Sequence, residues 1–219
     1  MGIHPERDSM ALCFDLDGTL GSFGGGYVLL RQALGDLWGH EPSAEELALC
    51  PGSTDWEIVD HLHRHRLGQP MTEDSYAAYD RACLARFSSA FHPEGRSPVV
   101  FEGIVAGMAL LLEKGHELWL VSGNTPSVLD FKARALGVDP RIHRLGSLPG
   151  LDRAGLILRA LEGSREPHLY VGDRPHDRQA ADRAGIPFLG VGDAVPGDHP
   201  LLSISAEARH LVEAVAALI

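Results

Sequence analysis

Acidic residues follow apolar segments at two places in this sequence, and a hydroxyl residue does so at a third. Asp15 and Asp17 stand one residue apart, where an apolar run meets the glycine-rich segment "GTLGSFGGG". Asp173 and Asp177 come after the run "HLYVG", and Ser122 comes after "HELWLV". Carboxylates that lie close together raise one another's pKa unless a cation or a shared proton intervenes. A hard cation with oxygen ligands resolves this repulsion, so we predict a Mg²⁺ site.

These side chains meet only if the segments before them are parallel strands of one sheet. Short apolar runs bounded by turn or polar residues have the composition of strands that are buried on both faces. The runs are residues 10–15, 116–122, 168–173 and 187–191. In an open parallel sheet the ligand crevice lies beyond the carboxyl ends of the strands. We therefore expect the residues that follow the first three runs to share one crevice.

Helical patterns alternate with these strands from residue 99 onward. In the segment "TPSVLDFKARALG", Thr125 is a candidate N-cap, Pro126 suits the first helical position, and Gly137 is a candidate stop. The segments "DRAGLILRALEG" and "HDRQAADRAG" also end in glycine, and "AEARHLVEAVAALI" runs to the C-terminus behind Ser205. This alternation predicts an α/β fold, a doubly wound (Rossmann-like) parallel sheet.

Residues 21–98 have helical periodicity throughout and no convincing strand. Their candidate helix starts are Ser43 with Glu46, Thr54 with Glu57, and Thr72. The segment "HPEGRSP" has the composition of a return linker. We therefore predict an α/β core domain of residues 1–20 and 99–219, interrupted by an all-helical domain of residues 21–98.

Three motifs in this order resemble the haloacid dehalogenase (HAD) superfamily. They are "DLDGT" after the first strand, a small hydroxyl residue in "LVSGNT" after the second, and "VGDRPHD" after the third. Together they cover nearly the whole chain, and the helical insert lies where many members carry a cap domain. The dehalogenases that name the family lack an aspartate at the position of Asp17, since a departing halide needs no proton. The resemblance therefore implies a phosphoryl-transferring member, similar to phosphoglycolate phosphatases.

The resemblance implies catalytic roles for residues of the first two motifs. Asp15 is expected to attack phosphorus and form an aspartyl-phosphate. Asp17 is expected to protonate the leaving oxygen, and later to take a proton from the water that cleaves this intermediate. Ser122 is expected to donate a hydrogen bond to a phosphoryl oxygen, and Gly18 to leave room for backbone amides that face the phosphoryl group. Such donors stabilise the charge of the transferring group.

The resemblance also implies the ligands of the Mg²⁺ ion. They are the carboxylates of Asp15 and Asp173 and the backbone carbonyl of Asp17, with support from Asp177. A carboxylate can approach an anionic phosphate only when a metal and fixed donors offset the repulsion. As a structural alternative, each aspartate after a strand is a turn or helix-cap residue, and for Asp177 the two interpretations are close to even.

The lysine that the family places before the third strand is missing from this sequence. Arg153 lies at the equivalent place, in the segment "LGSLPGLDRAGLILRAL". Arginine stays charged and grips phosphate through two donors. Lys132 is the rival, but it lies two turns, roughly 10 Å, into the preceding helix. We favour Arg153, and expect Arg153→Ala to cripple turnover and Lys132→Ala to have a mild effect.

Substrate contacts are less well defined. Asn124 is a candidate for binding substrate, with shaping of its turn as the alternative. Thr54 and Asp55 lie in "GSTD", which resembles a loop of phosphoglycolate phosphatase-like members, although a helix cap is the default interpretation of Thr54. We expect this loop and "GSFGGGY" to face the site. Arg174 and His176 contact either solvent or substrate.

Other polar residues carry structural interpretations. His61 and His65 have the i, i+4 spacing of a metal site, but without a third ligand we interpret them as part of a polar helix face. Cys13 lies inside an apolar strand and is interpreted as a core residue. The three cysteines form no CxxC pair and predict neither a disulfide framework nor a zinc site.

Composition narrows the classes of partner. A chain of 219 residues with 44% hydrophobic content can bury a sizeable core. A formal net charge of −11 disfavours nucleic-acid and membrane-surface binding, because both require an electropositive surface. The opening "MGIHPERDSM" has no signal-peptide core. We therefore expect a cytoplasmic protein that acts on a small phosphorylated metabolite; the sequence does not predict an oligomeric state.

Three hypotheses about function follow from these residues. The first is a Mg²⁺-dependent phosphatase of small phosphate monoesters. The second is a sugar-phosphate mutase of the same fold, which returns the phosphoryl group to a sugar instead of to water. The third is a non-catalytic module that binds a phosphorylated ligand or a protein partner. Release of inorganic phosphate distinguishes the first hypothesis from the other two.

Overall fold

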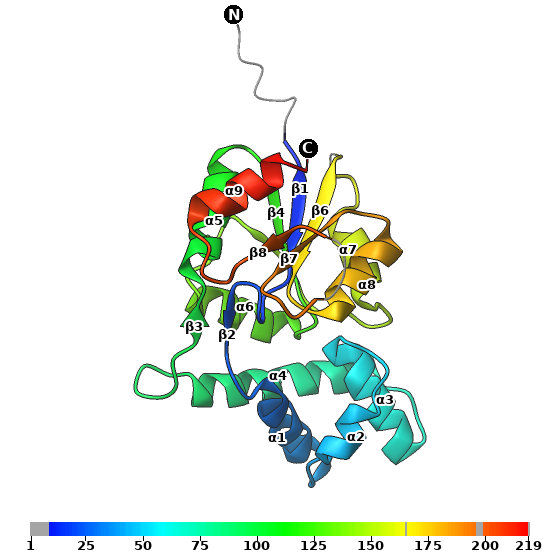
Figure 1. Ribbon diagram of the computed structural model, residues 1–219. Helices are drawn as coiled ribbons and strands as arrows, with labels where there is room; N and C mark the ends of the chain where they lie inside the picture. Colours follow the sequence, from blue (N-terminus) through cyan, green and yellow to red (C-terminus); the bar gives the residue numbers. More distant parts are fainter. Residues whose placement is uncertain (1–8, 165, 196–198, 219) are drawn as a thin grey trace, which may run out of the picture.

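A six-stranded sheet forms the centre of the molecule in the computed structural model, which describes residues 9–164, 166–195 and 199–218 (Figure 1). All of its paired strands are parallel, and the strand order is β5-β4-β1-β6-β7-β8. The strands are β1 (Ala11–Phe14), β4 (Glu117–Val121), β5 (His143–Leu145), β6 (His168–Gly172), β7 (Phe188–Val191) and β8 (Leu201–Leu202). The predicted doubly wound sheet is confirmed.

Helices cover both faces of this sheet. They are α5 (Glu102–Glu113), α6 (Pro126–Ala135), α7 (Arg153–Ala160), α8 (Pro175–Ala184) and α9 (Ala208–Ala216). Side chains of β1 alternate between the two faces: Leu12 and Phe14 pack into a core with α5, α6 and α9, while Ala11 and Cys13 pack with α7 and α8. This two-sided burial explains why the central strands read as continuous apolar runs.

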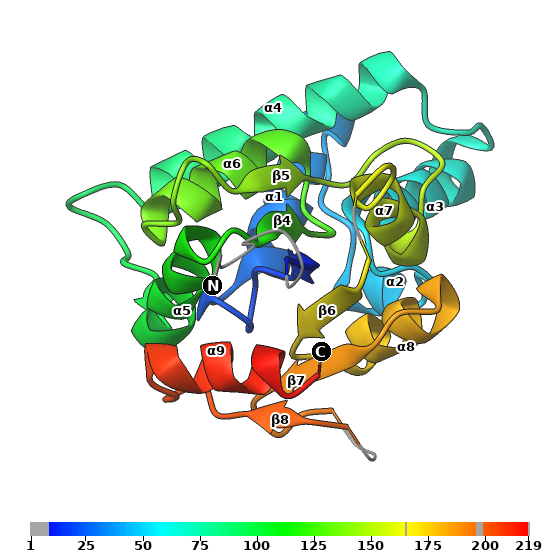
Figure 2. The same cartoon turned by 90° about the horizontal axis from the view of Figure 1, so that it is seen from above.

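The helical insert lies beyond the carboxyl ends of the strands, below the sheet in Figure 1. It contains α1 (Gly26–Trp38), α2 (Ala44–Ala48), α3 (Asp55–Leu67) and α4 (Glu73–Ala90). The predicted capping boxes of Ser43 with Glu46 and of Thr54 with Glu57 are both present, and the Thr72 hydroxyl caps α4. Helix α4 runs alongside α6 of the core (Figure 2), and Ser127 donates a hydrogen bond to Asp80 across this boundary.

The register of the central strands aligns the ends that carry the site. Phe14 of β1 pairs with Leu120 on one side and with Val171 on the other. The residues that follow these strands therefore emerge at the same edge of the sheet. The chain order reverses at β1, which lies between β4 and β6, and such a switch point is where open α/β sheets bind ligands.

The short strands were not predicted. The insert begins with β2 (Gly21–Ser22), which pairs antiparallel with β3 (Val99–Val100) where the insert returns to the core. The expectation of no strand in residues 21–98 is therefore wrong at its first two residues. β2, β3, β5 and β8 have two or three residues each, too few to show a periodic pattern.

Two helix starts also differ from the prediction. Thr125 precedes α6, but its hydroxyl makes no capping bond; its backbone N–H instead donates to the Asp55 carboxylate of the insert. The last helix begins at Ala208 with Glu207 as its N-cap, later than the Ser205 start predicted. Ile219 and most of the opening segment "MGIHPERDSM" lie outside the described residues. Within the described part of the chain, no helix has the length and apolarity needed to cross a bilayer.

Candidate active site

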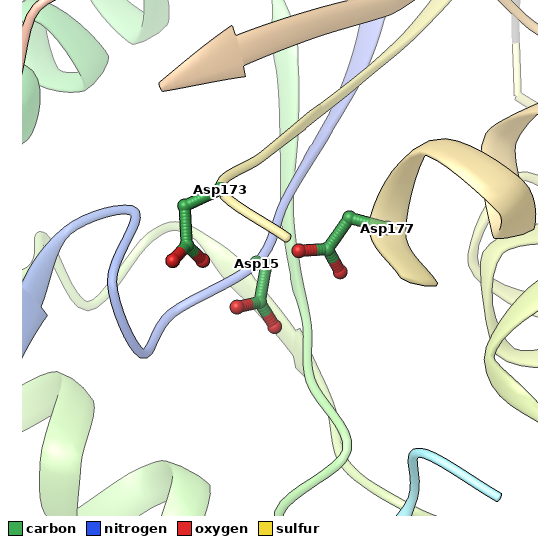
Figure 3. Close-up of side chains that lie close together, drawn as sticks. All are labelled: Asp15, Asp173 and Asp177. Atoms are coloured by element: carbon green, nitrogen blue, oxygen red, sulfur yellow. The ribbon is translucent and has the colours of Figure 1, made fainter. Parts of the chain in front are cut away.

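Three aspartates converge at the switch point of the sheet, one from the end of β1, one from the end of β6 and one from the first turn of α8 (Figure 3). Asp15, Asp173 and Asp177 each offer a carboxylate oxygen, and these oxygens lie within 4.8 Å of one another. All three residues are buried. Asp177 is fixed by its place in the helix, where its Oδ2 accepts the Arg174 backbone N–H at 3.0 Å.

Burial and nearby negative charge both disfavour the charged forms of Asp15 and Asp173. Burial raises the pKa of Asp15 well above its ordinary value, and the negative charge of Asp177 raises it further, while Arg153 lowers it. The pKa of Asp173 is raised to about 6, mainly by burial and then by Asp177. The site therefore holds more negative charge than its own side chains neutralise.

Arg153 supplies the positive charge closest to the predicted nucleophile. It is the first residue of α7, and its buried guanidinium reaches Asp15 Oδ1 with Nη1 at 2.8 Å. The same Nη1 lies 3.1 Å from Asp177 Oδ1, and Nη2 donates to the backbone carbonyl of Ser53 in the insert at 3.1 Å. Arg153 therefore contacts the predicted nucleophile, and its role toward a phosphate stays a prediction.

Lys132 also reaches the site, so the prediction that it lies too far away is wrong. Its Nζ contacts Asp17 Oδ2 at 2.6 Å and Asn124 Oδ1 at 2.8 Å. The distance along the helix axis misled the prediction, because helical side chains point toward the helix N-terminus. The N-terminus of α6 faces the crevice, and the four-carbon stem of Lys132 spans the distance. The expectation that Lys132→Ala is mild loses its basis.

Residues of the second motif hold Asp17 and each other. The Asn124 amide donates to Asp17 Oδ2 at 2.8 Å and to Ser122 Oγ at 2.7 Å. Ser122 is buried at the end of β4. Both residues line the cavity described below, and Asn124 orients its neighbours through its own side chain.

Gly18 takes a backbone conformation that other residues rarely adopt. Its φ is +90°, and a Cβ atom built on it falls 2.1 Å from Asp173 Oδ2. Thr19, the next residue of the "DLDGT" motif, donates its hydroxyl to Asp173 Oδ1 at 3.4 Å. The turn after β1 therefore requires glycine so that the first and third motifs can approach each other.

A cavity of about 610 Å³ lies between the insert and the core, directly above these residues. Its core wall includes Asp15, Asp17, Gly18, Ser122, Asn124, Lys132, Arg153, Arg174 and His176. Its insert wall includes Ser22, Phe23, Tyr27, Leu30, Ser53, Asp55, Ile58, Cys83 and Phe87. Both insert loops that were expected to face the site therefore do so.

The loop before α3 fastens the insert to the core. The Asp55 backbone N–H donates to the Gly123 carbonyl at 2.7 Å, and the Asp55 carboxylate accepts the Thr125 N–H at 3.0 Å. Burial raises the pKa of Asp55 to about 7. Thr54 is fully buried, its hydroxyl serves the capping box, and it does not line the cavity. The structure therefore gives no support for Thr54 as a substrate contact.

Of the remaining candidate residues, two line the cavity and three do not belong to the site. Arg174 and His176 line the cavity, and Arg174 Nε lies 3.0 Å from Asp173 Oδ2. His61 and His65 belong to none of the metal-binding clusters found among the described residues. Cys13 is buried in the core, where burial raises the pKa of its thiol.

Two contacts of the site were not anticipated. Tyr170 is a buried member of β6, and its hydroxyl donates to Asp177 Oδ1 at 3.2 Å. Ser53 of the insert receives the Arg153 guanidinium. Nothing distinguishes Tyr170 from its apolar neighbours in sequence, whereas Ser53 lies in a loop already expected to face the site.

The donor set fits a small divalent cation. Hard carboxylate oxygens from Asp15 and Asp173 lie close enough to share one ion, which is the chemistry that Mg²⁺ prefers. Arg153 balances part of the charge of the buried acids, and a bound dication would balance the remainder.

Comparison with known proteins places the chain in a family. Residues 12–182 match the family model described as haloacid dehalogenase-like hydrolase. No curated protein matches the sequence. Among solved structures, a hydrolase from Pseudomonas syringae superposes with a TM-score of 0.67 at 18% identity, covering 93% of this chain and 97% of that chain.

Two further solved structures share the fold. CbbY from Rhodobacter sphaeroides, in complex with phosphate, has a TM-score of 0.63 and 22% identity, covering 89% of this chain and 94% of that chain. A predicted phosphoglycolate phosphatase from Haemophilus somnus has a TM-score of 0.56 and 19% identity, covering 96% and 92%. The resemblance carried by the three sequence motifs is confirmed. The chain belongs to the haloacid dehalogenase-like hydrolases and is an enzyme of that family.

Proposed function

We propose that this enzyme is a Mg²⁺-dependent phosphatase that hydrolyses a small phosphate monoester through an aspartyl-phosphate on Asp15. One observation carries the proposal: Asp15, bound by Arg153, lines the cavity together with Asp17, and its carboxylate lies close to that of Asp173. A nucleophile, a proton carrier and a metal ligand are thus within reach of one phosphoryl group.

In the first step an Asp15 oxygen attacks phosphorus, and the bond from phosphorus to the leaving oxygen breaks. Asp17 gives its carboxyl proton to that oxygen, so that a neutral alcohol departs. Arg153 and Ser122 donate hydrogen bonds to the phosphoryl oxygens, whose charge is redistributed in the transition state. Arg153 also holds Asp15 in its orientation through the bond to Oδ1.

In the second step water attacks the phosphorus atom of the aspartyl-phosphate. Asp17, now a carboxylate, takes a proton from this water, and the bond from phosphorus to the Asp15 oxygen breaks. Inorganic phosphate leaves, and both carboxyl groups return to their starting states. The insert, which we propose acts as a cap of residues 21–98, limits access of bulk water during these steps.

The Asp15 and Asp173 carboxylates and the Asp17 backbone carbonyl would hold the Mg²⁺ ion, with Asp177 as support. Mg²⁺ supplies positive charge that offsets the repulsion between the nucleophile and the phosphate dianion.

The cavity restricts the substrate. Its volume of about 610 Å³ suits a compact metabolite. The cap wall contributes Phe23, Leu30, Ile58 and Phe87, and no lysine or arginine of the cap lines the cavity. A second anionic group on the substrate would therefore find no cation on that wall. We propose a leaving group that is compact and carries no further negative charge, in contrast to phosphoglycolate itself.

A panel of phosphate monoesters tests the proposal. The wild-type protein should release inorganic phosphate from monoesters of uncharged alcohols in the presence of Mg²⁺, and should lose this activity with EDTA and in Asp15→Asn. Formation of an isomerised sugar phosphate without phosphate release would indicate a mutase instead. Absence of turnover with every ester would contradict the proposal and favour a binding module.

A further inference from the structure

Lys132 lies where the two halves of the molecule meet, although no motif of the sequence includes it. It belongs to the last turn of α6, and its side chain is only 3% exposed. A buried ammonium group is unfavourable unless partners replace its water shell. Its partners on the core side are Asp17 Oδ2 at 2.6 Å and Asn124 Oδ1 at 2.8 Å.

The cap supplies the other partners of this ammonium group. Lys132 Nζ lies 4.6 Å from the ring centroid of Phe87 on α4 and 5.3 Å from that of Phe23, in the connection that follows β2. A cation is attracted to the face of an aromatic ring at such distances, and the attraction is larger where water is excluded. Two separate segments of the cap therefore hold the cation over the core.

The contacts of Lys132 differ from those of Arg153 in a way that separates their roles. Arg153 contacts the nucleophile Asp15, whereas Lys132 contacts the proton carrier Asp17. Lys132 and the Asn124 amide both bind the same oxygen of Asp17, Oδ2. The carboxyl group is thus anchored through one oxygen, which leaves Oδ1 for proton transfer.

We propose that Lys132 is a positioning residue that fixes the Asp17 carboxyl group toward the leaving oxygen and does so fully only when the cap is closed. This inference rests on the proposed phosphatase function. Closing the cap brings Phe23 and Phe87 against the ammonium group, and the ammonium group in turn holds Asp17. Proton donation is thereby linked to closure of the cavity.

The test compares two substrates that share the phosphoryl group but differ in their need for a proton. The leaving group of 2,4-dinitrophenyl phosphate departs as a stable anion, whereas that of butyl phosphate must be protonated. In Lys132→Met, the rate of the first step, measured as the burst of alcohol or phenol released, should fall by about 10²-fold for butyl phosphate, the scale of general acid catalysis, and by only a few fold for the dinitrophenyl ester. The KM values should change little.

Asp17→Asn is the matched control, because it removes the proton carrier itself. It should show the same selective loss for butyl phosphate in the first step, measured as the burst of alcohol released before hydrolysis of the intermediate. The double variant should be no slower in that step than Asp17→Asn alone, since both changes remove one function. A purely structural role of Lys132 would instead slow both esters equally and add to the Asp17→Asn effect, which would overturn the inference.

Lys132→Arg provides a second variant in case Lys132→Met does not fold. It keeps a positive charge between the two rings, but its planar fork cannot place one donor on Asp17 in the same way. A loss confined to butyl phosphate supports the inference, and an equal loss for both esters contradicts it. Failure of the wild-type protein to hydrolyse either ester would refute the phosphatase function itself. This result is distinguishable from the two outcomes for the variants, because those require an active wild-type protein.

Discussion

Three of the four acidic groups of the site each contact a different cation in the structure, and Asp177 shares Arg153 with Asp15. Arg153 contacts Asp15, Lys132 contacts Asp17, and Arg174 contacts Asp173. In the first two pairs the cation is buried, whereas the Arg174 side chain of the third pair is 58% exposed. Removing a buried partner leaves an uncompensated charge, while removing an exposed one changes little.

Arg153→Ala tests this difference at the level of one residue. The variant leaves Asp15 and Asp177 without the guanidinium between them, so the free energy of unfolding should fall by about 3–5 kcal/mol and phosphate release should be lost. Urea denaturation and a phosphate assay measure the two effects.

Arg159→Ala is the matched control, because Arg159 lies in the same helix and pairs with Glu162 on the surface. Its free energy of unfolding should change by about 0–1 kcal/mol, and its activity should remain. Equal effects of the two substitutions would contradict a special role for the buried cation.

Among the elements, α3 carries one of the contacts that hold the cap on the core, through its first residue, Asp55. The pKa of Asp55 is raised to about 7, first by burial, while the Thr125 N–H and the charge of Lys132 lower it and the charges of Asp17 and Asp80 raise it. Because the folded-state pKa lies above the ordinary value of 3.8, the folded protein binds this proton more tightly than the unfolded chain does. Asp55 therefore makes the protein less stable as the pH rises from about 4 to about 7.

Asp55→Asn should remove this dependence while keeping an oxygen for the Thr125 N–H. As the pH rises from 4 to 7, the free energy of unfolding of the variant should increase relative to that of the wild type by about 1.4 kcal/mol for each pH unit. Above pH 7 the difference should stay constant. Denaturation at a series of pH values measures it. A constant difference across the series would show that Asp55 is already ionised at low pH in the folded protein.

The wall of the cap is the element that we expect to choose the substrate. Ile58 of α3 lines the cavity, and Ile58→Arg would place a cation on that wall. The ratio of kcat/KM for phosphoglycolate to that for ethyl phosphate should rise by about tenfold, because a carboxylate then gains a partner.

Ile58→Met changes the shape of the wall without adding charge, and it should leave that ratio nearly unchanged. A similar rise in both variants would mean that the size of the cavity, and not its charge, discriminates between the two esters.

The sequence predicts the long elements of this fold better than the short ones. The apolar runs that became β1, β4, β6 and β7 are buried on both faces, and such burial leaves a clear pattern. β5, with the sequence "HRL", is a polar edge region next to β4 and leaves no such pattern. The chain at β5 is a strand because it pairs with β4, and its own sequence shows no strand pattern.

The same limit applies to the candidate site. The sequence predicts Asp15, Asp17 and Asp173 as site residues because Asp15 and Asp173 directly follow recognisable strands and Asp17 lies next to Asp15 in the same motif. The contact between Lys132 and Asp17 depends on how α6 is oriented over the crevice and on which way its side chains point, and spacing along the chain carries neither fact. The contribution of Tyr170 depends on its hydroxyl reaching α8 from inside the sheet.

At the scale of the whole molecule, the sheet and the cap perform separate tasks. The sheet brings three strand ends to one edge, and the insert closes the space above them. The two are joined by the short β2 and β3 pair and by the contacts of Asp55 and Lys132. Under the proposed function, the core carries out the chemistry, and the contact between the two parts selects the substrate and excludes water.

Chemical trapping of the phosphorylated enzyme tests the central claim, that Asp15 is the nucleophile, most directly. Borohydride reduces an aspartyl-phosphate to homoserine, and peptide mass spectrometry locates the reduced residue. With wild-type protein, Mg²⁺ and a phosphate monoester of an uncharged alcohol, the modification should appear at Asp15, and it should be absent without Mg²⁺ and in Asp15→Asn. Steady release of phosphate with no modification at Asp15, or with modification at another residue, would contradict the assignment of Asp15 as the nucleophile.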